Sequence, residues 1–225
     1  MIALGIIPAR GGSKGLPGKN LMALGGRSLI RRALDSAADS ALLTDYVVTT
    51  DSDAIAAEAV NAGGRVIMRP AELATDECGM VPVLQHAARA YGGRRPDLIV
   101  CLQPTSPFRT GAMIDGTIRK VNDTGADSAQ TVTEAPYSPF YMSTLDGDRV
   151  TPLFPDGHRY VARQACPPVY MPTGAVYVTR WRTLMDRGRV LGDDNRAVVC
   201  GFEESVNIDT IWDFRLAEVI AEERK

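Results

Sequence analysis

Two kinds of segment alternate along this 225-residue chain, and the alternation limits the possible fold more than any other feature. Short apolar runs typical of buried strands are separated by stretches with apolar residues at helical spacing. Strands are expected at residues 3–8, 46–50, 65–68, 98–102, 128–132, 174–179 and 197–201, and helices at 28–39, about 51–60, 81–91, 111–124, from 180 and from 211. Because parallel neighbours need a crossover between them, this order predicts a three-layer α/β fold with a mostly parallel sheet.

Composition and charge exclude several classes of protein. A net charge of −2 offers no basic surface for nucleic acid. The four cysteines form no C-x-x-C pair and the chain has two histidines, so neither a disulfide framework nor a Cys/His zinc site is expected. No G-x-S-x-G or H-E-x-x-H motif of a hydrolase occurs. Without an apolar run of 18 residues or a secretory leader, we expect one cytoplasmic domain over residues 1–225 that does not bind membranes.

The segment IPARGGSKGLPGKN follows the first expected strand directly. A Walker loop requires glycine and Ser/Thr at fixed positions, where this chain has Ser13 and Asn20. The dinucleotide fingerprint requires a glycine where Arg10 stands. What remains is a flexible loop with three cations, Arg10, Lys14 and Lys19, which predicts binding of a polyphosphate.

Two further polar segments follow the next strong strands. TTDSD follows the strand at 46–50, and QPTSPFRT follows the strand at 98–102. The carboxyl ends of strands in a doubly wound sheet meet at one edge, where ligands bind. We therefore expect both segments to lie beside the glycine-rich loop.

Residues 134–172 interrupt the alternation. They are rich in Pro, Tyr and Asp-Gly turns and show little helical periodicity. A long irregular insertion in a compact domain is usually a functional arm or lid. The aromatic residues predict an arm that is covered by a second copy of the chain, in a homodimer.

Five blocks of sequence together resemble one family. They are IIPARGGSKGLPGKN, RPAELATD, LQPTSPFRTG, RQACPPVYMPTGAVYV and SVNIDT. The same blocks occur in the same order in acylneuraminate cytidylyltransferases, which include the CMP-sialic acid synthetases and the corresponding enzymes for legionaminic and pseudaminic acid. The resemblance covers nearly the whole chain. It implies a Rossmann-like nucleotide-diphospho-sugar transferase fold and an exchanged dimerisation arm that also contributes to the sugar site.

The resemblance also implies a reaction and its residues. The anomeric hydroxyl of an α-keto sugar acid would attack the α-phosphate of CTP, and pyrophosphate would leave. The catalytic residues would be Arg10, Lys19 and Asp209. The nucleotide would be bound by Ala9, Arg10, Gly11, Gly12, Ser13, Lys19, Asn20, Arg69 and Asp76. The sugar would be bound by Gln103, Arg163, Gln164, Thr173 and Tyr177.

One departure from the family concerns the metal. Mg²⁺, or Mn²⁺, is expected to bridge phosphate oxygens. The family has two aspartates one residue apart near the C-terminus, where this chain has Asn207 and Asp209. Asn207 offers a neutral oxygen, so the metal is expected to bind more weakly or to be assisted by another acid such as Asp51. The alternative for Asp209 is a capping residue of the last helix.

Other departures concern the sugar. Thr173 stands where relatives commonly have Asn, and Phe140 and Met171 stand where some sialic acid enzymes have a cation. We therefore expect a more apolar, deoxy, di-N-acylated sugar acid. The alternatives are an enzyme of the same fold that uses Kdo or GTP, and a homologue with weakened catalysis.

Overall fold

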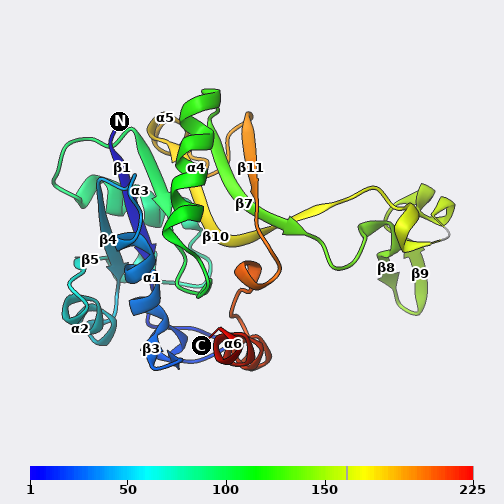
Figure 1. Ribbon diagram of the computed structural model, residues 1–225, viewed down its shortest axis with the longest axis horizontal. Coiled ribbons are helices and arrows are strands. Elements are labelled where there is room, and N and C mark those ends of the chain that lie inside the picture. Colours follow the sequence, from blue (N-terminus) through cyan, green and yellow to red (C-terminus); the bar gives the residue numbers. More distant parts are fainter. Residues whose placement is uncertain (161, 225) are drawn as a thin grey trace.

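A seven-stranded sheet with the order β11-β7-β10-β6-β1-β4-β5 forms the centre of the computed structural model (Figure 1). The structure describes residues 1–160 and 162–224, without the side chains of residues 157, 158 and 163. The strands of this sheet are β1 (Ala3–Pro8), β4 (Asp45–Thr50), β5 (Arg65–Met68), β6 (Leu98–Cys101), β7 (Ser128–Glu134), β10 (Tyr170–Arg180) and β11 (Asn195–Val199). β10 runs antiparallel to β6 and β7, and the other pairings are parallel. The predicted mostly parallel sheet is confirmed.

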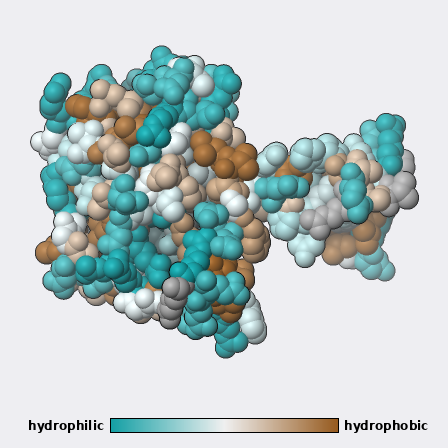
Figure 2. All heavy atoms as spheres, viewed as in Figure 1, coloured by the Kyte–Doolittle hydropathy of each residue, from teal (hydrophilic) through white to brown (hydrophobic). Residues whose placement is uncertain are grey.

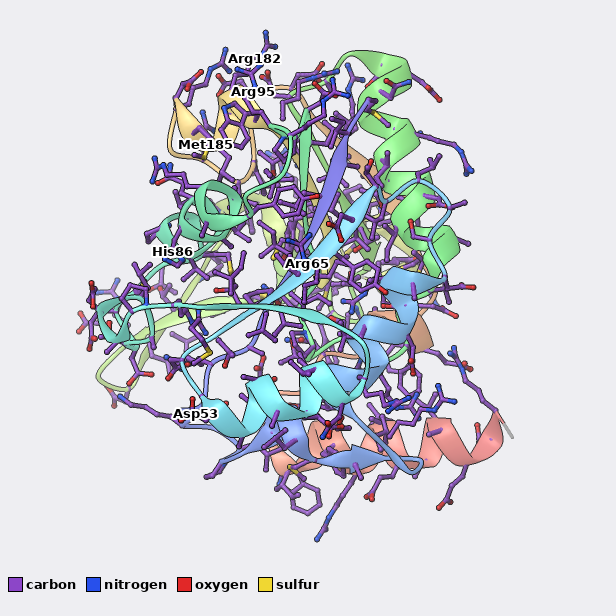
Figure 3. The ribbon with its side chains drawn as sticks, turned by 90° about the vertical axis from the view of Figure 1, so that its left-hand side faces the viewer. Asp53, Arg65, His86, Arg95, Arg182 and Met185 are labelled. Atoms are coloured by element: carbon purple, nitrogen blue, oxygen red, sulfur yellow. The ribbon has the colours of Figure 1, made fainter. Side chains whose placement is uncertain are left out.

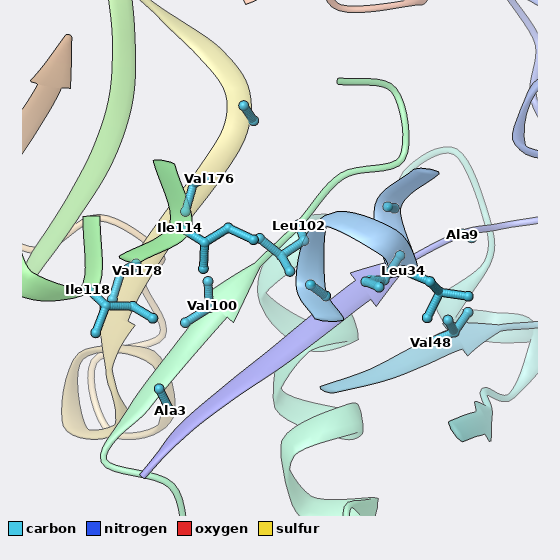
Figure 4. Close-up of a cluster of buried hydrophobic side chains, with 14 of the residues drawn as sticks. Ala3, Ala9, Leu34, Val48, Val100, Leu102, Ile114, Ile118, Val176 and Val178 are labelled. Atoms are coloured by element: carbon cyan, nitrogen blue, oxygen red, sulfur yellow. The ribbon is translucent and has the colours of Figure 1, made fainter. Parts of the chain in front are cut away.

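Helices cover both faces of the sheet, because alternate residues of each strand point to opposite sides. α1 (Leu29–Ala38), α2 (Asp53–Asn61) and α4 (Gly111–Thr124) pack on one face, and α3 (Met80–Ala90) and α5 (Trp181–Met185) pack on the other. In Figure 4, Ile114 and Ile118 of α4 lie against Val100 and Val176 of the sheet. The three predicted layers are therefore present.

The ends of the helices follow local capping residues. Ser28 and Ser52 accept hydrogen bonds from the first turns of α1 and α2, and Thr110 does so for α4. Gly125 ends α4 with a φ of 72°, a conformation that glycine adopts without strain. These signals explain why the predicted α4 has the observed bounds. Among the described residues, a helix with the length and the hydropathy of a membrane span is absent.

Each face of the sheet packs on its helices through one cluster of buried apolar residues, and a third cluster lies outside the sheet. α6 (Ile211–Glu223) packs there on the short ribbon of β2 (Ala23–Leu24) and β3 (Arg27–Ser28). Short 3₁₀ turns occur at Lys19–Leu21, Ala71–Leu73, Pro139–Tyr141, Pro155–Arg159, Arg163–Ala165 and Glu203–Ser205.

The insertion at 134–172 extends away from the body as an arm. Its tip is separated from the body by a narrow neck (Figures 1 and 2). The arm is more regular than predicted, because β7 and β10 continue into it and it carries a hairpin of β8 (Ser143–Asp146) and β9 (Arg149–Pro152). Phe140 lies 5.3 Å from Phe154 and 4.7 Å from Tyr160 between ring centroids, so the three rings pack on one another at the tip.

Candidate active site

A cavity of about 490 Å³ lies at the carboxyl ends of β1 and β6. Ten of the residues singled out in the sequence line it: Arg10, Ser13, Lys14, Lys19, Asn20, Arg69, Asp76, Gln103, Asn207 and Asp209. These residues come from four segments that are far apart in the sequence. The predicted meeting of the glycine-rich loop with QPTSPFRT is therefore observed.

The glycine-rich loop is attached to the body through its backbone. The Gly11 N–H donates to Asp51 Oδ1 at 3.0 Å, and the buried Asn20 donates from Nδ2 to the Arg10 carbonyl, also at 3.0 Å. Gly11 therefore uses its amide within the protein. Ala9 is buried and donates its N–H to Thr49, and neither Ala9 nor Gly12 lines the cavity. These residues shape the loop, while Arg10, Ser13 and Lys19 face the cavity.

Asp76 pairs with two cations of the loop. Its carboxylate lies 2.8 Å from Arg10 Nη2 and also contacts Lys14 Nζ. Hydrogen bonds from Lys14, and then from Arg10, lower the pKa of Asp76 below its ordinary value. Arg10 also donates to the Thr75 carbonyl at 3.2 Å. The segment around Asp76 thus forms the wall opposite the loop.

Lys19 reaches the segment near the C-terminus. Its Nζ lies 2.8 Å from Asp209 Oδ1 and donates to the Ile208 carbonyl at 3.2 Å. Asn207 Nδ2 donates to the other oxygen, Asp209 Oδ2, at 2.8 Å. Thr210 caps α6 in a reciprocal capping box with Asp213, so the alternative of Asp209 as the helix cap is wrong.

Asn207 has a second feature that bears on ligand binding. Its Oδ1 atom is buried and has no hydrogen-bond partner among the described residues. Leaving such an acceptor unpaired costs about 1–3 kcal/mol. Because Asn207 lines the cavity, a ligand or a cation there would supply the missing partner.

Arg69 is a nearly buried cation on the same cavity. It is 7% exposed, its closest carboxylate is Asp51 at 3.8 Å, and its Nε has no partner among the described residues. Burial lowers the pKa of Arg69 from its ordinary value, although Asp51 opposes this effect. A buried guanidinium with a free donor is suited to an oxygen of a ligand.

The predicted sugar residues are only partly brought together. Gln103 lines the cavity, whereas Thr173 is buried in β10 with its hydroxyl 2.7 Å from that of Thr131. Tyr177 packs with the apolar cluster under α3. Gln164 is exposed on the arm, and the side chain of Arg163 lies outside the described part of the structure.

The cavity offers oxygen ligands for a hard cation. No three His, Cys, Asp or Glu side chains in the described part of the chain come together as a metal site. Asp209 provides carboxylate oxygens and Asn207 a carbonyl oxygen, a donor set that suits Mg²⁺ when phosphates and water complete it. Asp51 holds Gly11 and does not line the cavity, which weakens the expectation that it assists the metal.

Other lining residues had no predicted role. Thr105, Cys78 and Met80 belong to this group. Thr105 stands inside the block QPTSPFRT, so membership of that block could have identified it. His86, labelled in Figure 3, lies on α3 and does not line the cavity.

Comparisons with known proteins show which family and fold the chain is similar to. A family model described as cytidylyltransferase matches residues 4–148. The chain is 31% identical to a CMP-N,N'-diacetyllegionaminic acid synthase of Legionella pneumophila, over 99% of this chain and 97% of that protein. It is 29% identical to an N-acylneuraminate cytidylyltransferase of Streptococcus agalactiae, over 93% of this chain and 51% of that protein, so it spans about half the length of this relative. A solved CMP:2-keto-3-deoxy-manno-octonic acid synthetase complexed with CTP superposes with a TM-score of 0.77 at 15% identity, over 100% of both chains.

Proposed function

The chain belongs to the cytidylyltransferase family, and from this premise we propose that it transfers the cytidylyl group of CTP to an α-keto sugar acid of the sialic, legionaminic or pseudaminic acid type. The anomeric oxygen forms a bond to the α-phosphorus, and the bond from that phosphorus to the oxygen bridging the β-phosphate breaks. Pyrophosphate leaves with the electron pair, and the hydroxyl proton passes to water. The products are a CMP-sugar and pyrophosphate.

The observation that carries this proposal is the set of charges around one cavity. Arg10, Lys14, Lys19 and Arg69 all line it, which matches the high negative charge of a nucleoside triphosphate. Preorganised cations stabilise the charge that develops on the phosphates during transfer. We assign the catalysis to binding and to charge stabilisation, the two effects that these cations can supply.

Binding of CTP requires an exchange of ion pairs. Asp76 holds Arg10 and Lys14 at the position where phosphate oxygens would contact them. A triphosphate carries more charge than this one carboxylate and would take over both cations. Before CTP binds, Asp76 keeps the two cations in place. After CTP binds, Asp76 would remain beside the nucleotide.

The buried guanidinium of Arg69 stands on the wall formed by residues 69–79, the part that would contact the base. Its free Nε fits the carbonyl oxygen of a pyrimidine.

A divalent cation would be held by Asp209 and Asn207. Mg²⁺ bound there would neutralise phosphate charge and orient the leaving group. Within the chain, Asn207 orients the Asp209 carboxylate and Lys19 balances its charge. These contacts keep the carboxylate at the edge of the cavity.

Two observations support a legionaminic-type acceptor. Of the predicted sugar residues, Gln103 lines the described cavity of a single chain. Positions 140 and 171 are occupied by Phe140 and Met171, which carry no positive charge. The diacetyllegionaminic acid synthase also matches over the full length of both chains, unlike the longer N-acylneuraminate enzyme.

We place the enzyme in the cytoplasm as a homodimer. Large apolar side chains are exposed on the arm, including Tyr137 at 76%, Leu145 at 72% and Val150 at 62%. A second chain would bury this surface, and its arm would bring its own Arg163 and Gln164 to the sugar site.

The proposal is tested by pyrophosphate release with a panel of acceptors. Diacetyllegionaminic, pseudaminic and N-acetylneuraminic acids and Kdo are each offered with CTP and, separately, with GTP. We expect turnover with CTP and a nonulosonic acid. Lys19→Met should lower turnover about 10²–10³-fold, and Lys120→Met on α4 serves as a control outside the cavity. The proposal would be refuted if pyrophosphate were released with GTP but not with CTP. It would also be refuted if none of the acid acceptors gave pyrophosphate release.

A further inference from the structure

Arg109 is a buried cation for which neither the sequence nor the reaction assigned a role. It is 5% exposed and makes no ion pair with a carboxylate in the described part of the chain. Burial lowers the pKa of Arg109 to about 10, so the side chain is protonated at neutral pH. A buried charge without a counterion is costly to the fold, and neutral acceptors must hold it. This cost calls for a reason to keep an arginine at this position.

The guanidinium connects three separate segments. Nη1 donates to the Gln103 carbonyl at 2.8 Å and to the Ala175 carbonyl at 3.0 Å, and Nε donates to Ser36 Oγ at 3.0 Å. Gln103 belongs to the loop after β6, Ala175 to β10 and Ser36 to α1. Arg109 therefore fixes the backbone of the one predicted sugar residue on the cavity to the sheet.

The other side of Gln103 is fixed by an irregularity in β10. The pairing of β10 with β7 shifts register between Pro172 and Tyr177, and Gly174 within this bulge has a φ of 76°. A Cβ at Gly174 would lie 3.1 Å from Gln103 Oε1. The side chain of Gln103 thus lies against the bulge, while its backbone is held by Arg109. Bulges of this kind often aim residues at an active site.

Within the described part of the chain, the side-chain amide of Gln103 makes no hydrogen bond. Among the described residues, the bonds around Gln103 involve its backbone carbonyl, which accepts from Arg109 and from the Ser106 N–H at 3.3 Å. The direction of the side chain therefore depends on the backbone contacts and on the shape of the bulge. Its amide group stays available for a ligand.

We propose that Arg109 is a positioning residue that sets the affinity and reactivity of the acceptor sugar acid through Gln103, without contributing to CTP binding. This inference rests on the proposed cytidylyl transfer. The planar fork of arginine can serve three acceptors in two directions at once, and the single ammonium of lysine cannot reproduce that geometry. The residues assigned to CTP binding lie on other segments, and the printed acceptors of Arg109 in the described part of the chain do not include any of them.

The test compares Arg109→Lys with Arg180→Lys. Arg180 is the control, because it is half-buried and, like Arg109, donates to two backbone carbonyls, those of Ala126 and Val121, at 2.7 and 3.1 Å. It lies among the residues of a different pocket, with Arg95 and Arg182. In Figure 3 these two labelled residues lie at the end of the molecule opposite α6.

Three quantities are measured for each variant: CTP affinity by calorimetry, kcat and KM for the acceptor, and the melting temperature. For Arg109→Lys we expect kcat/KM for the acceptor to fall roughly 10²-fold, the effect of about 1 Å of misplacement, with CTP affinity within about twofold of wild type. Arg180→Lys should lower the melting temperature but leave the acceptor kcat/KM and the CTP affinity within about twofold of wild type. An equal loss of CTP affinity and acceptor kcat/KM in Arg109→Lys would overturn the proposal.

A double-mutant cycle with Gln103→Ala tests the route of the effect. If Arg109 acts through Gln103, the double variant should lose no more acceptor kcat/KM than Gln103→Ala alone. Additive losses would overturn the proposal. Should Arg109→Lys fail to fold, Ser36→Ala removes one of the three acceptors, and we expect the same selective loss at about fivefold to tenfold, in line with one weakened hydrogen bond. A wild-type protein that binds CTP but transfers to no acceptor would instead refute the proposed function.

Discussion

Replacing Asn207 by Asp tests the placement of the metal without measuring catalysis. In the wild type, the Asn207 amide donates to Asp209 Oδ2 at 2.8 Å. The aspartate would remove this donor and place a second carboxylate beside the first. At this separation two unit charges repel by about 1.5 kcal/mol in water and by about 6 kcal/mol at an effective dielectric of 20. Because the Asp209 side chain is 63% exposed, the lower value applies.

The expected result depends on the divalent cation. Adding the lost hydrogen bond gives a destabilisation of about 2 kcal/mol in EDTA, which lowers the melting temperature by about 4–8 °C for a chain of this size. A second carboxylate should also bind Mn²⁺ more tightly. If the dissociation constant falls about tenfold, saturating Mn²⁺ returns about 1.4 kcal/mol more stability to the variant than to the wild type.

The assay is thermal unfolding over a Mn²⁺ titration, with EDTA as the starting point. Asn207→Ala is the matched control, because it loses the same hydrogen bond and adds no charge. It should melt lower than the wild type and gain less from Mn²⁺. If Mn²⁺ raised the melting temperatures of all three proteins equally, residues 207 and 209 would not hold the metal.

Three further predictions concern two single residues and the arm. Lys19→Ala should lower kcat about 10²–10³-fold in a folded protein, measured by pyrophosphate release, and near-normal turnover would contradict its catalytic role. Gly174→Ala should cost about 1–2 kcal/mol through its φ of 76° and raise the acceptor KM by displacing Gln103, measured by thermal unfolding and initial rates. Deletion of residues 136–160 should give a monomer by analytical ultracentrifugation, and a surviving dimer would show that the arm is not the interface.

Local signals in the sequence predicted most of the body. The bounds of α4 follow from Thr110 and Gly125, and β1 follows from an apolar run that ends at a proline. The sequence also placed the segments of the cavity, because strands in a parallel sheet end at one edge. The hairpin of β8 and β9 was not predicted, although the Asp146-Gly147 pair is a hairpin signal and Gly147 has a φ of 61°.

Long-range contacts in the site were beyond prediction from local pattern. In the sequence, Arg109 is the last residue of the QPTSPFR block, and the block does not indicate its partners. These partners, Ser36 and Ala175, are 73 and 66 residues away. The sequence suggests Asp51 as a residue that assists the metal, whereas in the structure its carboxylate accepts a hydrogen bond from the Gly11 N–H. Such partners are selected by the packing of distant segments, which periodicity and capping residues do not encode.

The contact of Lys19 with Asp209 has a consequence for biosynthesis. The two residues are separated by 190 positions, and the backbone at Gly15 also approaches the Asp209 carbonyl so closely that a Cβ would lie 2.5 Å from it. During translation the glycine-rich loop emerges early, yet it meets its partner only after residue 209 has left the ribosome. Contacts of such long range form late, because a large chain loop must close first. A nascent chain that has not yet exposed residue 209 therefore lacks the Lys19–Asp209 contact and the part of the cavity wall that this segment forms.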